Sequence, residues 1–580
     1  MKTQLSLTIA AMWITSASFS QCSPATAMDT LNINQVSALM LNGGDMWWNP
    51  GFTATGQYEV PKGSGSMPIY AGAIWIGGID LGNQLHLAAQ EYRNGGGNDF
   101  WPGPLDTISV TTDSTSCSKY NKIWKIGRYK VEEFKYEWNL GNVQNGTYKP
   151  DSNIISWPGN GDVSKGQAKY LAPYVDVNHN SIYDPLAGGD YPKIKGDQML
   201  WWIFNDNGNV HSGTQCPPLG VEIHASAYSY TCPQIADSLQ VINYTTFYHY
   251  EIFNRGGNLY DSVYVASWMD PDLGCGTDDF VGCYPKGNYS YCYNGEKIDP
   301  VNCGNGQIGY GLNPPMVSTV ILNGPLANPN DGVDNNNNGI IDEPGEKNLM
   351  THFVYFSNHP HQYPRPTICP DYYNYLSGTW EDSTFLTYGG TGYKSSAIKT
   401  NFCFPDFPYD TSGWSEVTAG LTPGDRRAVT SCGPFTMLPG AVDTFDFAVV
   451  WSRDTALPWL SKASFDKNLH DNQRVQRWFA QDSFPSCLAL NVGVHEADQN
   501  ANNLIISPNP SSDFIFVNYK SKSLHPQFEI YDVMGRKVSG LQFTVFGSQQ
   551  QINISKLVSG LYLLKVTDGE FQFSKKFVKN

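Results

Sequence analysis

The chain has 580 residues, of which 41% are hydrophobic and 13% aromatic, so it is long enough to bury one large core or several. Only 16% of the residues are charged, below the roughly 25% usual in globular domains, a balance typical of extracellular β-rich proteins. The net charge is −16 and no cluster of Lys or Arg stands out, so a phosphate backbone would be repelled and nucleic acid is excluded as an expected partner.

Residues 1–20 have the pattern of a cleaved secretory signal peptide. Lys2 is followed by an apolar run centred on 5–14, and small residues precede Gln21. The run is too short and too rich in Ser and Thr to be a lasting membrane anchor. No other run approaches the roughly 18 apolar residues of a spanning helix, so we expect an exported passenger over 21–490 without a transmembrane segment.

The first part of the passenger, to about Ser114, predicts short strands rich in glycine and aromatic residues. Four tryptophans stand out in this part: Trp47, Trp48, Trp75 and Trp101. They could form a sugar-stacking platform or an aromatic core, and the core is the favoured interpretation.

Two loops have the spacing of a calcium-binding loop, in which oxygen ligands alternate along one tight turn. The first departs from the EF-hand pattern, because Ser181 replaces the usual glycine and Ala187 the bidentate acid. The second has Gly339 at the sharp turn and resembles the calcium loops of dockerins and thrombospondin type 3 repeats. We predict Ca²⁺ in both, as a brace; the alternatives are an Asx-rich turn for the first loop and a low-complexity linker for the second. The predicted ligands are Asp176, Asn178, Asn180, Asp184 and the carbonyl of Ile182, and Asp334, Asn336, Asn338, Asp342 and the carbonyl of Ile340.

Alternating apolar runs predict strands in sheets packed face to face, at 241–253, 262–269 and 443–451. Their return near residue 237 suggests a candidate boundary within the passenger. One helix is expected at about 464–482, with Ser464 as its N-cap. In the last of the runs one face collects the large side chains Phe445, Phe447, Val449 and Trp451.

An acidic group supplies the candidate catalytic residues, since two carboxylates a few ångströms apart can hydrolyse a glycosidic bond. Asp-Pro-Asp is also an ordinary turn at a strand end, and its carboxylates can instead ligate a cation. The sequence contains no nucleophile elbow, Walker loop or His-Glu-x-x-His motif, which removes the simplest arguments for an enzyme. The four candidates are Asp270, Asp272, Asp278 and Asp279.

The chain has 12 cysteines, and disulfides are expected in a chain that crosses an oxidising periplasm. Four of them could alternatively bind zinc, but their spacing is wider than the tight pairs of structural zinc sites, so disulfides are favoured for Cys275, Cys283, Cys292 and Cys303.

Beyond Cys487 the chain becomes polar, which predicts a linker over 491–503 and a separate C-terminal domain over 504–580. Short alternating runs split by Ser, Gly and Asp-Gly turns predict a small antiparallel sandwich there.

Four motifs in this domain, in this order and spacing, are Pro508-Asn509-Pro510, the run from Tyr531 to Val538, the run from Leu557 to Tyr562, and the terminal run from Lys575 to Lys579. They resemble the type A C-terminal sorting domain of type IX secretion substrates in the Bacteroidota. The resemblance implies recognition by the type IX machinery at the outer membrane and removal on the far side. The passenger would then be released or attached to surface lipopolysaccharide. No catalytic role is implied.

Pieces of the passenger resemble large secreted proteins that carry the same tail, a family without an established activity: 43–48, 70–78, 196–202, 268–274, 279–283 and 291–295.

The sequence therefore predicts a mainly β protein, with a β-sandwich-rich passenger followed by a small immunoglobulin-like antiparallel β-sandwich. We expect a secreted or cell-surface protein of the type IX pathway whose passenger is a binding, adhesion or structural module, stabilised by calcium, for an extracellular glycan or protein ligand. The alternative is a secreted hydrolase acting on polysaccharide or protein.

Overall fold

A computed structural model describes residues 22–485 and 504–580, apart from gaps at 53–54, 94–96, 305, 337, 358–362, 520–526, 533–535, 539–542, 547–548 and 569–570. The predicted signal peptide and the predicted linker lie outside these residues. The chain divides into two compact units, Met1–Val492 and Gly493–Asn580, and both are mainly β, as predicted.

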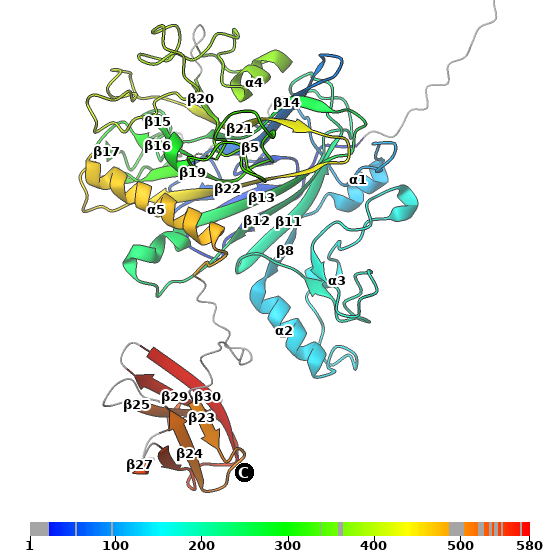
Figure 1. Cartoon of the computed structure of the whole chain (residues 1–580), viewed down its shortest axis with the longest axis vertical. Helices are drawn as coiled ribbons and strands as arrows, with labels where there is room; N and C mark the ends of the chain where they lie inside the picture. Colours follow the sequence, from blue (N-terminus) through cyan, green and yellow to red (C-terminus); the bar gives the residue numbers. More distant parts are fainter. Residues whose placement is uncertain are drawn as a thin grey trace, which may run out of the picture. The chain divides into compact units, whose positions relative to one another are not determined.

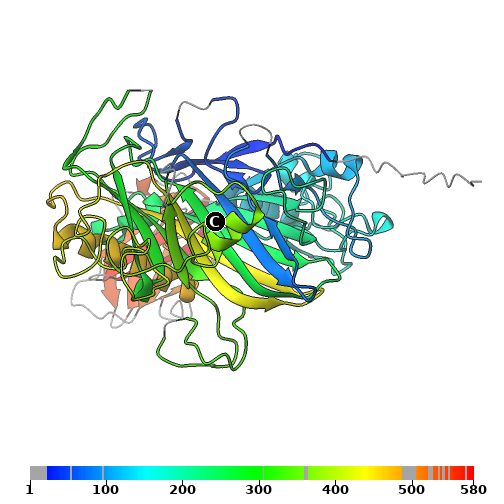
Figure 2. The same ribbon diagram turned by 90° about the horizontal axis from the view of Figure 1, so that it is seen from above.

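The first unit contains two large antiparallel sheets, each of nine strands among the described residues. In the first sheet the order along the main path is β1-β2-β3-β5-β14-β21-β20, so strands from distant parts of the chain lie side by side, as their blue, green and yellow colours show in Figure 2. Its strands are β1 (Met28–Leu31), β2 (Ser37–Leu41), β3 (Asp45–Met46), β4 (Tyr58–Glu59), β5 (Ala71–Asp80), β6 (Leu85–Ala88), β14 (Tyr260–Asp270), β20 (His352–Phe356) and β21 (Arg427–Met437).

The second sheet has the order β15-β16-β19-β22-β13-β12-β11-β7, with β8 paired to β11. Figure 1 shows its long central strands as one continuous layer. Its strands are β7 (Trp101–Pro102), β8 (Trp124–Gly127), β11 (Gln198–Asn205), β12 (Val221–Ser229), β13 (Thr245–Asn254), β15 (Asp279–Tyr284), β16 (Tyr289–Asn294), β19 (Met316–Asn323) and β22 (Val442–Ser452). Two short hairpins complete the unit, β9 (Tyr174–Val175) with β10 (Tyr191–Pro192) and β17 (Ile298–Asp299) with β18 (Gly311–Leu312).

The two sheets share one aromatic core. Trp47, which directly follows β3, donates its indole N–H to the hydroxyl of Tyr248 in β13 at 3.0 Å, and this bond links the two sheets. A Cβ at Gly72 would lie 2.3 Å from the Trp47 ring, so glycine in β5 permits this close approach. All four tryptophans of the sequence analysis are at most 2% exposed. The surface platform is therefore wrong, and the core interpretation is correct.

Alternate residues of the second sheet divide between its two faces. Val317 and Ile321 of β19 enter the core between the sheets, whereas Met316 and Val320 face a second apolar cluster. The predicted face of β22 is confirmed, since all four of its large side chains lie in the first core. The outer face of the sheet is covered by α5 (Lys462–Ala480), which packs on β19 and β22 (Figure 1).

The run predicted as a strand from residue 241 begins as a 3₁₀ helix, η3 (Asp237–Tyr244), and becomes extended only at Thr245. The cause is local: the Asn243 side chain exchanges hydrogen bonds with both backbone groups of Cys232, at 2.6 and 2.9 Å, and this holds the turn closed. Residue 237 lies between β12 and β13, which pair in one sheet.

The predicted helix is α5, but its N-cap is Ser461 rather than Ser464. The Ser461 hydroxyl accepts a hydrogen bond from the backbone N–H of Ser464 at 3.2 Å. The shorter helices were not predicted, because each supplies too few apolar repeats to be distinguished from a loop. They are α1 (Ser114–Tyr120), α2 (Arg128–Asn139), α3 (Ser152–Ile155), α4 (Cys369–Leu376), η2 (Val163–Lys165) and η4 (Pro285–Gly287).

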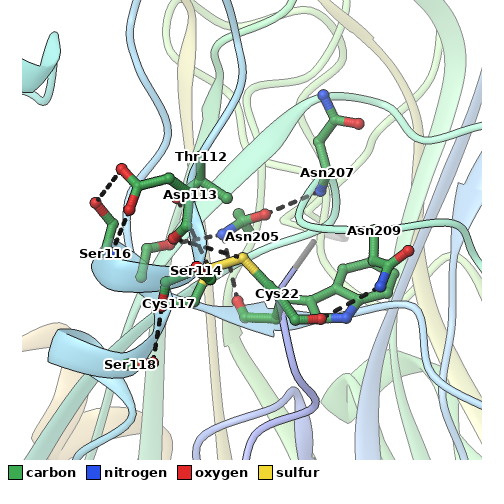
Figure 3. Close-up of a disulfide and its surroundings, with 12 residues drawn as sticks. Cys22, Thr112, Asp113, Ser114, Ser116, Cys117, Ser118, Asn205, Asn207 and Asn209 are labelled. Atoms are coloured by element: carbon green, nitrogen blue, oxygen red, sulfur yellow. Dashed lines mark hydrogen bonds between the residues drawn. A yellow bond between two sulfur atoms is a disulfide. The ribbon is translucent and has the colours of Figure 1, made fainter. Parts of the chain in front are cut away.

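Disulfides are confirmed, although not throughout the predicted cluster. The bridges described are Cys22–Cys117, Cys216–Cys369 and Cys275–Cys303. Figure 3 shows the first, which fastens the start of the passenger to α1, while the Cys22 carbonyl accepts a hydrogen bond from Asn209. Cys283 and Cys292 are buried free thiols, contrary to prediction, because the register of β15 and β16 pairs them with Ser290 and Val281 instead of with each other.

The second unit consists of two four-stranded antiparallel sheets, which confirms the predicted sandwich-like tail. Its core includes Ile515, Ile530, Leu564 and Phe577, all with 0% exposure. One sheet contains β23 (Leu504–Ser507), β24 (Phe514–Tyr519), β28 (Gln549–Asn553) and β27 (Phe543–Phe546), and the other β26 (Lys537–Val538), β25 (Gln527–Asp532), β29 (Gly560–Asp568) and β30 (Phe571–Lys579).

The N-cap assignment predicts unequal effects of two serine substitutions. Ser461→Ala removes the acceptor for the first turn of α5 and should lower the free energy of unfolding by about 1 kcal/mol. Ser464→Ala, the matched control, keeps that acceptor and should cost clearly less. Urea denaturation measures both, and a larger loss for Ser464→Ala would contradict the assignment.

Candidate functional site

The strongest site in the first unit lies where three central strands of the first sheet end together. In the antiparallel register Asp270, the last residue of β14, pairs with Ala71 at the start of β5. On its other side Met269 pairs with Ala428, which places Arg427 of β21 at the same edge. Tyr70 donates its backbone N–H to the Asp270 carbonyl at 2.8 Å. The ends of β14, β5 and β21 thus bring a carboxylate, a phenol and a guanidinium together.

The loop after β14 adds a second carboxylate, which is held in place from two directions. The Cys275–Cys303 disulfide ties this loop to the segment that carries Gln307. The Gln307 amide donates a hydrogen bond to Asp272 at 2.7 Å. Gly276 leaves room for the same carboxylate, since a Cβ there would lie only 2.1 Å from its oxygen. The position of Asp272 therefore depends on a glycine, an amide and a disulfide.

Arg427 links the charged groups of this edge. Its Nε lies 3.2 Å from a carboxylate oxygen of Asp270, and its Nη1 forms an ion pair with Asp425. Its Nη2 donates a hydrogen bond to the hydroxyl of Tyr92 at 3.3 Å. Asp270 is 2% exposed and Arg427 8%, so both groups are largely shielded from water and each is the other's partner.

The carboxylates of Asp270, Asp272 and Asp425 each have an oxygen within 4.8 Å of the others. Burial raises the pKa of Asp270 well above its usual value, although Arg427 opposes the shift. Burial, reinforced by the negative charge of Asp425, raises the pKa of Asp272 to about 7. The group can thus share a proton near neutral pH, and its convergent oxygens also suit a hard cation.

These residues line an open cavity of about 300 Å³. Two tyrosine rings, of Tyr70 and Tyr92, stand edge to face on its wall with centroids 5.8 Å apart. The volume is within the range of small-ligand sites, and the lining combines aromatic rings with convergent polar groups. The full lining is Tyr70, Tyr92, Asp270, Asp272, Gly276, Thr277, Gln307, Asp425 and Arg427, which we call the acidic cavity.

Two of the four predicted acids do not line the acidic cavity. Asp279 is fully buried and accepts a hydrogen bond from the backbone N–H of Leu273 at 2.9 Å. It therefore stabilises the loop that follows β14. Asp278 accepts a hydrogen bond from Asn294 at 3.0 Å, and burial raises its pKa to about 6. The structure thus brings Asp270 and Asp272 together in the cavity and places the other two beside it.

Sequence reasoning missed the partners of these acids. Asp425 and Arg427 lie more than 150 residues after the two acids of the cavity in the sequence. Tyr70 and Tyr92 lie far before those acids. The available signal was the pair Arg426-Arg427 at the start of an alternating strand, β21. Only the pairing of β14 with β5 and β21 reveals which strand ends meet.

The first predicted calcium loop has its polar side chains gathered. Asp176 accepts the backbone N–H groups of Asn180 and Ser181, at 3.1 and 2.8 Å. The amides of Asn178 and Asn180 both point at the Asp184 carboxylate, at 3.2 and 3.0 Å. The side chains at positions 3 and 5 thus converge on the carboxylate at position 9, while the carboxylate at position 1 binds the backbone of the turn and the Ile182 side chain is exposed.

The second loop repeats this pattern with one difference. Asp334 accepts the backbone N–H groups of Asn338 and Gly339, at 3.0 and 2.8 Å. The amides of Asn336 and Asn338 converge on Glu343, not on the predicted Asp342. The Asp342 carboxylate instead accepts the Gly332 N–H at 3.2 Å, and the Ile340 side chain is exposed.

The motifs of the second unit have structural roles. The Asn509 side chain accepts a hydrogen bond from the backbone N–H of Val578 at 2.8 Å and donates one to the Lys576 carbonyl at 3.3 Å. The Pro-Asn-Pro segment is thus hydrogen-bonded to the last strand, β30. Arg536 forms an ion pair at 2.8 Å with Asp532, the last residue of β25. These contacts close the C-terminal sandwich.

The comparison with protein families agrees. Residues 506–580 match the model described as the secretion system C-terminal sorting domain. The second unit is therefore a type IX sorting domain, and the chain is a type IX substrate that is exported to the cell surface or released. No helix in the described part of the chain is long and apolar enough to cross a membrane.

No curated protein matches the chain. Among solved structures, a polysaccharide lyase matches with 8% identity over 62% of this chain and 34% of its own, at a TM-score of 0.17. The chain thus spans about a third of that protein's length, and a score this low carries no argument about fold or activity.

The raised pKa of Asp272 predicts a pH-dependent stability. In the unfolded chain this carboxyl ionises near pH 4, but in the folded chain only at about pH 7, so the folded state binds more protons between these values. Its contribution to stability therefore falls as the pH rises through this window. Asp272→Asn abolishes that fall. Urea denaturation should therefore show that the free energy of unfolding of the variant rises relative to that of the wild type between pH 5 and pH 8.

Asp410→Asn is the control for this measurement. Hydrogen bonds to Ser412 lower the pKa of Asp410, so its carboxylate is ionised at both pH values and the substitution should have the same effect at each. An Asp272→Asn effect that is equally pH-independent would contradict the assignment.

Proposed function

We propose that the exported passenger is a carbohydrate-binding protein of the cell surface or the medium, and that the sugar binds in the acidic cavity. The observation that supports this is the combination, in one open cavity, of two tyrosine rings with three carboxylates, a guanidinium and an amide. Sugar hydroxyls donate to carboxylates and accept from Arg and amide groups, while the C–H face of a sugar ring packs on aromatic rings.

The fixed positions of the polar groups favour binding of a defined ligand. Asp272 is held by Gln307 and Gly276, and Arg427 is held by Asp270 and Asp425, so few side chains need to be ordered when a sugar enters. Preorganised groups of this kind lose little entropy on binding. Export through the sorting domain would deliver this cavity to the extracellular space, where glycans are the abundant polymers.

A glycan array and calorimetry with the full chain test this proposal. Asp272→Ala should weaken binding of the sugar about 10- to 100-fold, because hydrogen bonds to a charged group contribute roughly 1.5–3 kcal/mol. Gly276→Ala should weaken it as well, since the new methyl group displaces the Asp272 carboxylate without removing it.

Asp278→Ala is the matched control, since Asp278 is a neighbouring acid with a raised pKa that does not line the cavity. The affinity of the Asp278→Ala variant for the sugar should stay within about twofold of that of the wild type. Equal losses in all three variants, or no sugar bound by the wild type, would contradict the proposal.

A hydrolase is the second candidate, because the three carboxylates have oxygens within 4.8 Å and the pKa of Asp272 lies near neutrality. A group with this pKa serves as proton donor and acceptor in glycoside hydrolysis. Asp272 would be the acid, with Asp270 or Asp425 as the second carboxylate. Each glycan bound in the array is therefore examined for cleavage products, and turnover would favour this candidate.

We also propose that Ca²⁺ braces the two Asx-rich loops. Support comes from their shared geometry, in which two Asn side chains of each loop converge on one carboxylate. Neutral Asn at two positions lowers the charge of each site, so affinity should fall in the weak extracellular range, on the order of 10⁻⁴ to 10⁻³ M.

Calcium should therefore stabilise the wild-type chain. At about 10 mM Ca²⁺ each site contributes roughly 1.4–2.7 kcal/mol, which calorimetry or thermal melting detects as a higher Tm than in EDTA. The double variant Asp176→Ala with Asp334→Ala should lose this response. A wild-type Tm that does not differ between calcium and EDTA would contradict calcium bracing.

A further inference from the structure

A second cavity of about 230 Å³ borders the acidic cavity, and Tyr92 lines both. It is lined by residues from the segment after β6, from a loop before β12 and from the start of α4. We call it the side cavity; its lining is Ala89, Gln90, Glu91, Tyr92, Gly97, Ser212, Gly213, Arg365 and Tyr372.

The walls of the side cavity are rigidly connected. Asp99, which is fully buried, accepts hydrogen bonds from the Gly213 N–H at 2.9 Å and from the Thr214 hydroxyl at 2.6 Å. A Cβ at Gly97 would lie 3.2 Å from the Gly213 Cα, so these two backbones pack closely. The Cys216–Cys369 disulfide fastens the same loop to α4, which supplies Tyr372.

The charges of the side cavity are balanced, unlike those of the acidic cavity. Arg365 forms an ion pair with Glu91 at 3.0 Å, and its guanidinium lies over the Tyr92 ring, 5.1 Å from the centroid. Tyr372 also donates to Glu91, at 3.4 Å. The lining thus offers paired charges, hydroxyls and aromatic rings, with no net charge to attract an ion.

One donor of the side cavity lacks a partner. Gln90 is 3% exposed, and its side-chain carbonyl accepts the Asp99 N–H at 3.3 Å. Its amide nitrogen has no hydrogen-bond partner among the described residues. The backbone at Gln90 is held in place, because the Trp75 indole N–H donates a hydrogen bond to the Gln90 backbone carbonyl at 2.8 Å. Buried amide N–H groups are usually paired in folded proteins, so this donor is the one in the side cavity that an acceptor on an entering molecule would satisfy.

We propose that the side cavity is a second sugar subsite, so that the ligand is an oligosaccharide of at least two units that crosses Tyr92 with one unit in each cavity. This inference rests on the proposed carbohydrate function. The two cavities are complementary: the acidic cavity offers mainly acceptors, whereas the side cavity offers the Gln90 amide as a donor. Sugar hydroxyls satisfy both, since each is a donor and an acceptor.

Calorimetry with the full chain tests this with cello-, chito-, manno- and malto-oligosaccharides of one to six units. The wild type should bind the disaccharide or a longer member of one series at least about 10-fold more tightly than its monosaccharide. Gln90→Leu removes the donor with little change in volume. It should lower affinity for the longer sugars about 10-fold and leave the monosaccharide within about twofold.

Two further variants make the test independent of folding defects in Gln90→Leu. Ser212→Trp changes an exposed residue and obstructs the side cavity, so it should reproduce the selective loss. Gln84→Leu, at an exposed glutamine that does not line the cavity, should change nothing.

The outcomes separate the two proposals. If the wild type binds sugars with no dependence on length, or if both cavity variants weaken monosaccharide and oligosaccharide equally, the second subsite is wrong and the carbohydrate function stands. If the wild type binds no sugar of any length, the carbohydrate function itself fails, and the subsite fails with it.

Discussion

The buried ion pair of Asp270 with Arg427 is the interaction on which the acidic cavity depends. The two groups are 2% and 8% exposed and lie 3.2 Å apart, and removal of one partner from a buried pair of this kind typically costs about 3–5 kcal/mol. The same guanidinium also binds Asp425 and Tyr92. The wall of the cavity is therefore determined by the register of three neighbouring strands, which places the two ends of this pair side by side.

The sequence predicts the elements whose periodicity is long enough to be unambiguous. The strand β22 and the helix α5 are of this kind, and so are the Gly-rich aromatic strands that form the core. The alternating run from residue 241 misleads because the side chain of Asn243 closes a turn before the strand begins. Short helices such as α4 escape notice, although α4 supplies Tyr372 to the side cavity and covers the outer face of the first sheet.

The candidate site is predictable only in part, for a topological reason. Asp270 and Asp272 were found because an acidic turn after a strand is visible locally. Their partners are not local: Tyr70 directly precedes β5, Arg427 begins β21, and both strands pair with β14 across more than 150 residues. Gln90 carries no sequence signal at all, since its role follows from the missing partner of a buried amide. The C-terminal domain, in contrast, was predictable from the sequence, because Asn509 and the strand to which it is hydrogen-bonded belong to one short domain whose motifs lie close together in the chain.

The central claim is that the edge of the first sheet binds a sugar, and a crystal structure of the full chain with the tightest-binding oligosaccharide tests it most directly. We expect electron density for one sugar unit beside Tyr70, Asp272 and Arg427, and for the next unit beyond Tyr92 within reach of the Gln90 amide. Sugar bound at any other surface, with both cavities filled only by solvent, would contradict sugar binding at this edge.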